Sequence, residues 1–191
     1  MTYDREISDS EILAEMLKPD PLIHWKNEYG KEVLCLSEPN APASRAEIHG
    51  IPHDAVVLKA DRFPAPQAIF QGKKGECDRA DFIIISELRR VVLYIEMKQS
   101  ESKAWKVIRQ LKGAFCCLKY CQTIGREFWG KSDFLEGYRD RFVAITNTGP
   151  QKQKSVEYKN APVHDCPEKF MKIPSPHHLQ YNKLVGREKK G

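Results

Sequence analysis

The sequence lacks long apolar runs, and none of its hydrophobic stretches approaches the length of about 20 residues that a membrane-spanning helix needs. Its mean hydropathy of -0.56 also argues against a membrane protein. The opening residues, MTYDREISDS, do not have the basic-then-apolar order of a signal peptide. We therefore expect a cytoplasmic protein without a membrane partner.

Paired cysteines are also missing, because the six cysteines are scattered and none forms a CxxC pair. Three of them, Cys116, Cys117 and Cys121, fall in one predicted helix, where most should behave as small buried hydrophobic residues. This use of cysteine favours a reduced, intracellular protein.

The chain contains enough apolar sequence for one core, since 41% of its 191 residues are hydrophobic. We expect one domain over residues 1–150, with a basic, proline-containing extension over 151–191 packed on it.

The net charge is +5, but it is unevenly distributed. Residues 1–40 carry four Lys and Arg against nine Asp and Glu, whereas residues 97–131 carry eight against two and residues 151–191 nine against four. A basic surface after position 97 is expected if that part faces a polyanion, although a solvated lysine-rich surface would show the same pattern.

The pattern of apolar residues predicts an α/β fold. Two β-rich runs, FIIIS at 82–86 and VVLYIEM at 91–97, are joined by Glu-Leu-Arg-Arg and predict an antiparallel hairpin. Neither run alternates between apolar and polar residues, so we expect the hairpin at the centre of a sheet with helices on each side. The other predicted elements are helices at 8–18, 43–48 and 101–121, strands at 31–37, 55–60 and 141–147, a loop at 61–80 and an edge strand at 171–174.

The predicted hairpin brings charged residues together. Glu96 and Lys98 are two residues apart on one strand, so their side chains project from the same face. A turn centred between Leu88 and Arg89 pairs residues whose numbers sum to 177, which places Asp81 opposite Glu96. Opposed side chains have Cβ atoms about 4.5–5.5 Å apart. Two carboxylates this close repel each other, and a divalent cation such as Mg²⁺ relieves the repulsion.

Lys98 beside such a metal can orient the attacking water or help to deprotonate it, and can stabilise charge that develops on a phosphate. The structural alternative is a salt bridge between Lys98 and Glu96 or Asp81. Glu-x-Lys alone occurs often by chance. The catalytic interpretation is favoured by the arrangement of the two strands. An acidic residue lies at the start of one apolar strand, and the register places it opposite the Glu-x-Lys at the end of the next.

The segments GECDRADFIIIS and VVLYIEMKQS resemble the core of the PD-(D/E)xK, or restriction-endonuclease-like, nuclease superfamily. The resemblance covers residues 81–147 and implies a central mixed four- to five-stranded sheet flanked by helices, in αβββαβ order. It assigns the catalytic roles of the family to Asp81, Glu96 and Lys98, with Asp81 and Glu96 as ligands of Mg²⁺ or Mn²⁺.

The first carboxylate is the least certain member of this set. The Pro-Asp dipeptide that names the motif is absent, because Ala80 precedes Asp81, and both Glu76 and Asp78 compete for the role. The register places Asp78 opposite Gln99, beyond the face of the Glu-x-Lys motif, so Asp81 remains the candidate.

The same resemblance points to accessory residues. Some exonuclease-like members carry a Gln on the following helix that points towards the active site, and Gln110 matches it. Many members have an acidic residue on the first core helix, for which Glu47 is a candidate and Glu15 an alternative. The alternative for each of these residues is an ordinary position on the surface, without a role in the site.

Basic residues on the predicted helix after the hairpin suit contacts with phosphates, and Lys103, Lys106 and Arg109 are the candidates for nucleic-acid binding. Exposed basic residues that only keep the protein soluble would show the same pattern. We expect Trp105 and Trp129 to pack rather than to stack on bases.

These features predict a Mg²⁺-dependent (or Mn²⁺-dependent) nuclease, an endonuclease in preference to an exonuclease, that hydrolyses DNA in genome or antiviral defence, restriction or repair. DNA is preferred to RNA by analogy with the family. A chain this small, without a module that reads sequence, is expected to act as a homodimer or as a subunit of a larger complex. The alternatives are a non-catalytic nucleic-acid-binding or assembly subunit with the same fold, and an RNA-directed nuclease.

Overall fold

The computed structural model describes residues 7–23, 25, 27–28, 31–38, 41–63, 66–146, 163–174 and 178–186. The predicted N-terminal helix is present as α1 (Asp9–Met16). Ser8 caps this helix, because its hydroxyl accepts a hydrogen bond from the Glu11 amide while the Glu11 carboxylate accepts one from the Ser8 amide.

The centre of the molecule is a mixed five-stranded sheet with the strand order β4-β5-β6-β7-β8. Its strands are β4 (Val56–Lys59), β5 (Phe82–Ser86), β6 (Val91–Lys98), β7 (Arg139–Thr146) and β8 (Met171–Ile173). β4, β5 and β6 are antiparallel neighbours, whereas β6, β7 and β8 run parallel. The predicted central hairpin and the predicted edge strand are therefore confirmed.

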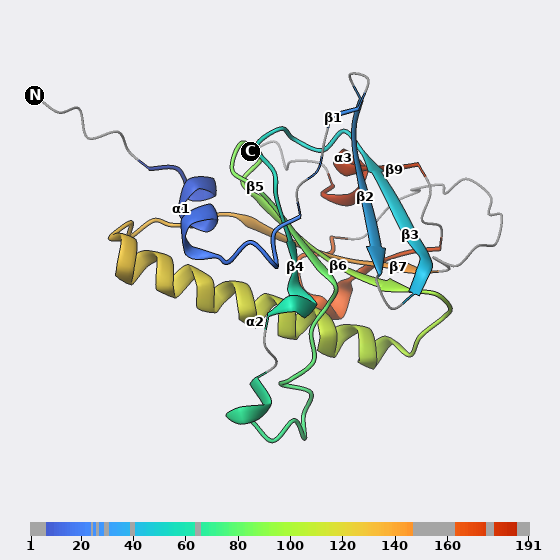
Figure 1. Ribbon diagram of the computed structural model, residues 1–191. Helices are drawn as coiled ribbons and strands as arrows, with labels where there is room; N and C mark the ends of the chain where they lie inside the picture. The colour runs from blue at the N-terminus through green and yellow to red at the C-terminus, as the bar shows by residue number, and fades with distance from the viewer. Residues whose placement is uncertain are drawn as a thin grey trace, which may run out of the picture.

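The long helix α2 (Ala104–Trp129) covers one face of this sheet, with α1 beside its C-terminal half (Figure 1). Buried α2 residues such as Leu111 and Leu118 pack with alternate residues of the hairpin, among them Tyr94. The helix was predicted to end near residue 121 but continues to Trp129, and Gly130 caps it with a φ of +67° that favours glycine at a helix C-terminus. No helix in the described part of the chain is long and apolar enough to cross a membrane.

A second sheet, together with a short helix, covers the opposite face of the central sheet (Figure 1). Its strand order is β1-β2-β3-β9, and the strands are β1 (Asn27–Glu28), β2 (Lys31–Glu38), β3 (Ala41–His49) and β9 (Leu179–Gln180). The short helix is α3 (Tyr181–Leu184), which follows β9 directly. Helices thus lie on both faces of the central sheet, but the second face is covered mainly by strands.

The helix predicted at 43–48 is wrong, because this segment is part of β3 and pairs antiparallel with β2. Ser44, Ala46 and Ile48 are buried, and the residues between them are more exposed, which is the two-residue period of a strand. Ala, Arg and Glu in this segment favour a helix locally, but pairing with β2 overrides that weak preference.

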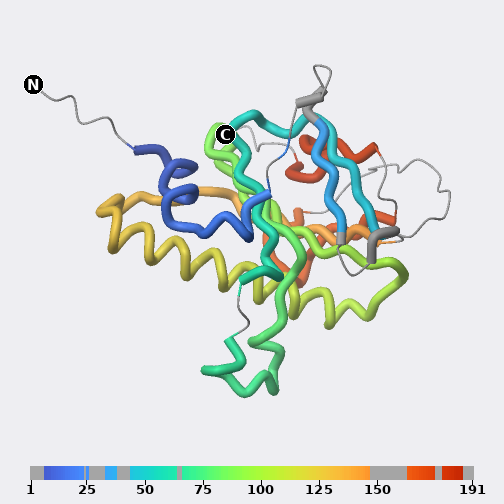
Figure 2. The backbone as a smooth tube through the Cα atoms, viewed as in Figure 1, coloured from blue at the N-terminus to red at the C-terminus, as the bar shows by residue number. Residues whose placement is uncertain are grey.

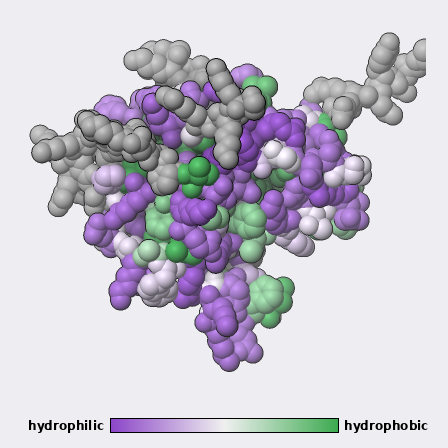
Figure 3. Space-filling model, turned by 180° about the vertical axis from the view of Figure 1, so that it is seen from behind, coloured by the Kyte–Doolittle hydropathy of each residue, from purple (hydrophilic) through white to green (hydrophobic). Residues whose placement is uncertain are grey.

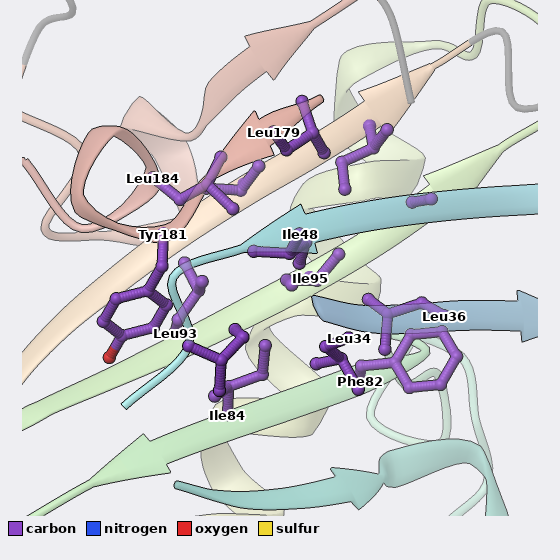
Figure 4. Close-up of a cluster of buried hydrophobic side chains, with 14 of the residues drawn as sticks. Leu34, Leu36, Ile48, Phe82, Ile84, Leu93, Ile95, Leu179, Tyr181 and Leu184 are labelled. Carbon is purple, nitrogen blue, oxygen red and sulfur yellow. The ribbon is translucent and has the colours of Figure 1, made fainter. Parts of the chain in front are cut away.

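The core between the two sheets contains residues from distant parts of the chain (Figure 4). Leu34 and Ile48 of the second sheet pack with Leu93 and Ile95 of β6, and Leu184 of α3 joins them. The described residues of the C-terminal part therefore belong to the same core as the hairpin. With β1–β3 inserted after α1, the order α1-β4-β5-β6-α2-β7 follows the predicted αβββαβ arrangement.

The loop predicted at 61–80 is present between β4 and β5 and contains two short 3₁₀ helices, η1 (Ala60–Arg62) and η2 (Pro66–Ala68). It projects from the body of the molecule beyond α2 (Figure 2). The loop then returns to the sheet and ends at Asp81, immediately before β5.

Candidate active site

The hairpin register places Asp81 opposite Glu96. The Cα pairs between β5 and β6 begin with Phe82 and Ile95, and the residue numbers of every pair sum to 177. Asp81 precedes Phe82 by one residue, so extending the same register by one residue assigns it to Glu96. The predicted register is confirmed for the five pairs that residues 82–86 form.

Asp81 is held to β6 by its backbone and by its side chain. Its amide donates a hydrogen bond to the carbonyl oxygen of Ile95 at 3.2 Å, and its Oδ2 accepts one from the Met97 amide at 2.6 Å. The Asp81 carbonyl oxygen accepts a hydrogen bond from the Ala60 amide at 2.8 Å, which joins it to the end of β4. Because Glu96 lies between Ile95 and Met97, these bonds hold the Asp81 carboxylate beside Glu96.

Glu96 has a fully buried side chain, and its Oε1 forms an ion pair with Nζ of Lys98. A buried carboxylate is expensive to desolvate unless a cation offsets its charge, and Lys98 supplies that charge. Lys98 keeps 26% of its side chain exposed, so the pair lies at the border between core and solvent. The salt bridge considered above as a structural alternative is therefore present. It also holds the ammonium group beside the carboxylate, as catalysis would require.

The pair projects from the face of the sheet that α2 covers. Tyr94 precedes Glu96 by two residues and belongs to the cluster that packs on α2, so Glu96 shares its face. On the neighbouring strand β7, Ala144 pairs with Glu96 and Thr146 pairs with Lys98. The site therefore lies at the end of β6, close to the point where α2 begins.

The loop that leads to Asp81 is packed directly against α2. A Cβ atom on Gly113 would lie 1.6 Å from the carbonyl oxygen of Asp78, so only glycine allows this approach. Arg109, one turn earlier on α2, forms an ion pair with Asp78, with 2.8 Å between Nε and Oδ2. This role of Gly113 was not predicted from the sequence, where a glycine inside an amphipathic helix was the available signal.

The carboxylates of Asp81 and Glu96 supply oxygen donors that suit a hard divalent cation. Mg²⁺ is commonly held by one or two carboxylates, and water and substrate phosphate complete its coordination. Among the residues described, no group of three or more His, Cys, Asp and Glu side chains is placed to hold a metal ion. Asp81 and Glu96 would therefore hold a metal as a pair, together with the substrate.

The competing acidic residues of the loop have other partners. Asp78 pairs with Arg109, and Glu76 accepts hydrogen bonds from the amides of Gly72 at 3.0 Å and Lys74 at 2.8 Å. Hydrogen bonds from backbone amides, first from its own amide and then from that of Lys74, lower the pKa of the exposed Glu76 carboxyl. Both side chains thus stabilise the loop, whereas Asp81 bonds to β6.

The candidate residues on α2 differ in their surroundings. Gln110 is half-buried, one turn after the buried Val107, and Lys103 and Lys106 are exposed. Trp105, expected to pack, is instead half exposed, with the Lys106 Nζ at 5.6 Å and the Arg109 Cζ at 5.4 Å from its ring centroid. Trp129 packs against the core as expected.

The structure does not bring the proposed accessory carboxylates to the site. Glu47 lies on β3, between Ala46 and Ile48, and both of these point into the core between the two sheets. Its side chain therefore points away from that core and from the α2 face. Glu15 accepts a hydrogen bond from Trp129 at the opposite end of α2. The assignment of Glu47 depended on a first core helix that is a strand here.

Comparisons with models of protein families, with curated proteins and with solved structures found no match to this chain. The function is therefore inferred from the site itself.

Proposed function

We propose that this chain is a metal-dependent nuclease that hydrolyses DNA phosphodiester bonds with Asp81, Glu96 and Lys98. The observation that carries the proposal is the meeting of these three residues at the ends of two central strands. A buried carboxylate and a partly exposed ammonium group on one face, opposed by a second carboxylate, form the arrangement expected for phosphodiester hydrolysis.

In this reaction, the oxygen of a water molecule forms a bond to phosphorus and gives up one proton to the solvent. The bond from phosphorus to the sugar oxygen of the leaving strand breaks, and this oxygen takes up a proton from solvent water. A Mg²⁺ or Mn²⁺ ion held by Asp81 and Glu96 would acidify water and polarise the phosphate. Lys98 donates hydrogen bonds to the attacking water or to the phosphate oxygens and stabilises the negative charge that develops there. Glu96 holds the Lys98 ammonium in position through its ion pair.

The surroundings of the site support a polyanionic substrate. Lys103 and Lys106 are exposed on α2, which begins where β6 ends, and Trp105 lies between them. Arg109 contributes less free charge, because it pairs with Asp78. We infer DNA as the substrate, a cytoplasmic location, and assembly as a homodimer or with partner subunits that select the target, in defence, restriction or repair.

The test is an incubation of the full-length protein with plasmid DNA, linear duplex DNA, single-stranded DNA and RNA, with Mg²⁺, with Mn²⁺ and with EDTA. We expect metal-dependent cleavage of DNA. Lys98→Met and Glu96→Gln should each lower the rate by at least about 10²- to 10³-fold, the usual effect of removing one group that stabilises the transition state. The matched controls are Lys112→Met and Glu101→Gln, whose side chains form exposed ion pairs with Glu168 and Lys172.

Metal binding is measured separately by thermal unfolding. A ligand that binds the folded state raises its stability, so Mg²⁺ or Mn²⁺ should raise the Tm of the parent and of Glu101→Gln, but not of Glu96→Gln. Cleavage of RNA alone would favour the RNA-directed alternative. Binding of nucleic acid without cleavage would favour a non-catalytic subunit. Equal cleavage by the Lys98→Met variant and the parent would overturn the catalytic role of Lys98.

A further inference from the structure

The loop between β4 and β5 carries two large apolar side chains at its projecting end. Ile69 is 78% exposed and Phe70 is 50% exposed, whereas the later part of the loop, at Gly75 and Asp78, packs on α2. Figure 3 shows the projection at the lower edge of the molecule, with an apolar patch beside hydrophilic surface. Exposed apolar side chains that adjoin each other and project from the body mark a contact surface.

This end of the loop is held in one conformation by local bonds. The amides of Ile69 and Phe70 both donate to the carbonyl oxygen of Pro66, at 2.9 Å and 2.8 Å. Glu76 accepts bonds from the amides of Gly72 and Lys74, which fixes the return of the chain. Two apolar side chains are therefore presented on a pre-organised support, and little conformational entropy would be lost when they bind.

The charge around the apolar pair is mainly positive. Lys73 and Lys74 follow it after Gln71 and Gly72 and are exposed, as are Lys103 at the N-cap of α2 and Lys106 in its first turn. The connection between the loop and this part of α2 is direct, because a Cβ on Gly75 would meet the guanidinium of Arg109 at 1.9 Å. Apolar residues beside several lysines suit a partner with an apolar interior and an anionic surface.

We propose that Ile69 and Phe70 form a wedge that enters between stacked base pairs of duplex DNA while the lysines contact its phosphates. Apolar side chains that insert at a base step partly unstack it and bend the duplex. The loop ends at Asp81, so a duplex bent by this wedge would lie beside the candidate active site. The inference thus extends the proposed function to the way in which substrate is bound. Two side chains are too few for a stable protein interface, which favours the duplex as the partner.

The experiment uses the full-length protein, without metal, and a duplex with 2-aminopurine at successive positions, whose fluorescence rises when its base unstacks. We expect the parent protein to raise this fluorescence at one step. Phe70→Ala should lose the increase and bind about tenfold more weakly in fluorescence anisotropy, as expected for one lost stacking contact. Phe70→Trp should retain the response.

The matched control is Phe128→Ala. Phe128 is 77% exposed near the C-terminal end of α2, about 28 Å along the helix from Arg109. The Phe128→Ala variant should bind and unstack DNA as the parent does. Circular dichroism should show that all variants are folded. A second variant, Lys73→Ala with Lys74→Ala, should reduce the dependence of binding on salt concentration.

The wedge is overturned if the parent does not bind the duplex, or if Phe70→Ala unstacks and binds DNA as well as Phe128→Ala does. It is also overturned if Phe70 instead governs binding to vesicles of phosphatidylcholine and phosphatidylserine, which would make the loop a membrane contact. A Phe70-dependent fluorescence response without any cleavage would support the wedge while the proposed nuclease activity fails. If the Phe70→Ala variant binds, unstacks and cleaves DNA like the parent, the proposed nuclease activity is supported and the wedge fails.

Discussion

The Met97 amide donates a hydrogen bond to Oδ2 of Asp81 at 2.6 Å, in the position where the ladder between β5 and β6 ends. The Asp81 side chain therefore continues the contact between the strands beyond their last pair. This bond gives Asp81 a structural role in addition to its proposed role in catalysis, and the two roles predict different effects for different substitutions.

Asp81→Ala removes the acceptor and leaves a strand amide without its partner, so we expect a loss of about 1–3 kcal/mol in the free energy of unfolding. Asp81→Asn keeps an oxygen that accepts the bond and should lose much less. Both variants lose the negative charge and should lose DNA cleavage together. Chemical denaturation and a plasmid nicking assay measure the two effects. Full activity of Asp81→Asn would assign the bond to Met97 as the only function of this side chain.

Gly113→Ala tests the contact between α2 and the loop that leads to Asp81. An alanine in the interior of a helix is normally more favourable than glycine by about 1 kcal/mol. Here its Cβ would lie 1.6 Å from the Asp78 carbonyl oxygen, so the loop has to move. We expect a lower Tm and weaker DNA cleavage. Thr123→Ala, at an exposed position on the same helix, is the control, and a Tm of Gly113→Ala above that of the parent would contradict the contact.

Asp9 forms a buried network far from the site. Its side chain pairs with Lys131 at 2.8 Å and accepts hydrogen bonds from the Tyr138 hydroxyl at 2.8 Å and the Leu135 amide at 3.1 Å. Asp9→Asn would leave Lys131 without its counter-charge, so we expect a loss of about 3–5 kcal/mol in urea denaturation. Asp20→Asn, at an exposed position after α1, should change little. Cleavage per folded molecule should remain at the parent rate, which separates this network from the site.

Asp140 predicts a pH dependence of stability. Burial raises the pKa of its carboxyl above the ordinary value of 3.8, against the opposing effects of Lys119 and of the hydrogen bond that the Tyr94 hydroxyl donates at 3.1 Å. Between the unfolded and folded pKa values, the folded protein binds more protons than the unfolded chain. The contribution of Asp140 to stability is therefore full below this window and falls as pH rises through it.

Asp140→Asn should remove this decrease of stability with rising pH, and its side-chain oxygen still accepts the hydrogen bond from the Tyr94 hydroxyl. The free energy of unfolding of the variant, relative to the parent, should rise as pH increases above about 3.8 and become constant once the pH exceeds the raised pKa of the folded state. Urea denaturation of both proteins at a series of pH values measures the difference. A difference that does not change with pH would show that the Asp140 carboxyl titrates alike in the folded and unfolded states.

The sequence alone determined the central hairpin, the helix after it and the positions of Glu96 and Lys98. These features depend on short spacings: a two-residue repeat in a strand, a three- and four-residue repeat in a helix, and a turn that sets the register. The register that predicts the opposition of Asp81 and Glu96 followed from the same local geometry, and the five β5–β6 pairs in the structure agree with this register.

The tertiary structure decided the features that depend on contacts between distant segments. Residues 43–48 form a strand because β2 is available to pair with them, and this turns Glu47 away from the α2 face. Gly113 became necessary only because the Asp78 backbone approaches α2. Likewise, nothing in the order of residues shows that Ile69 and Phe70 project into solvent rather than pack. Local preference is worth only fractions of a kcal/mol per residue, so burial and pairing between remote segments override it.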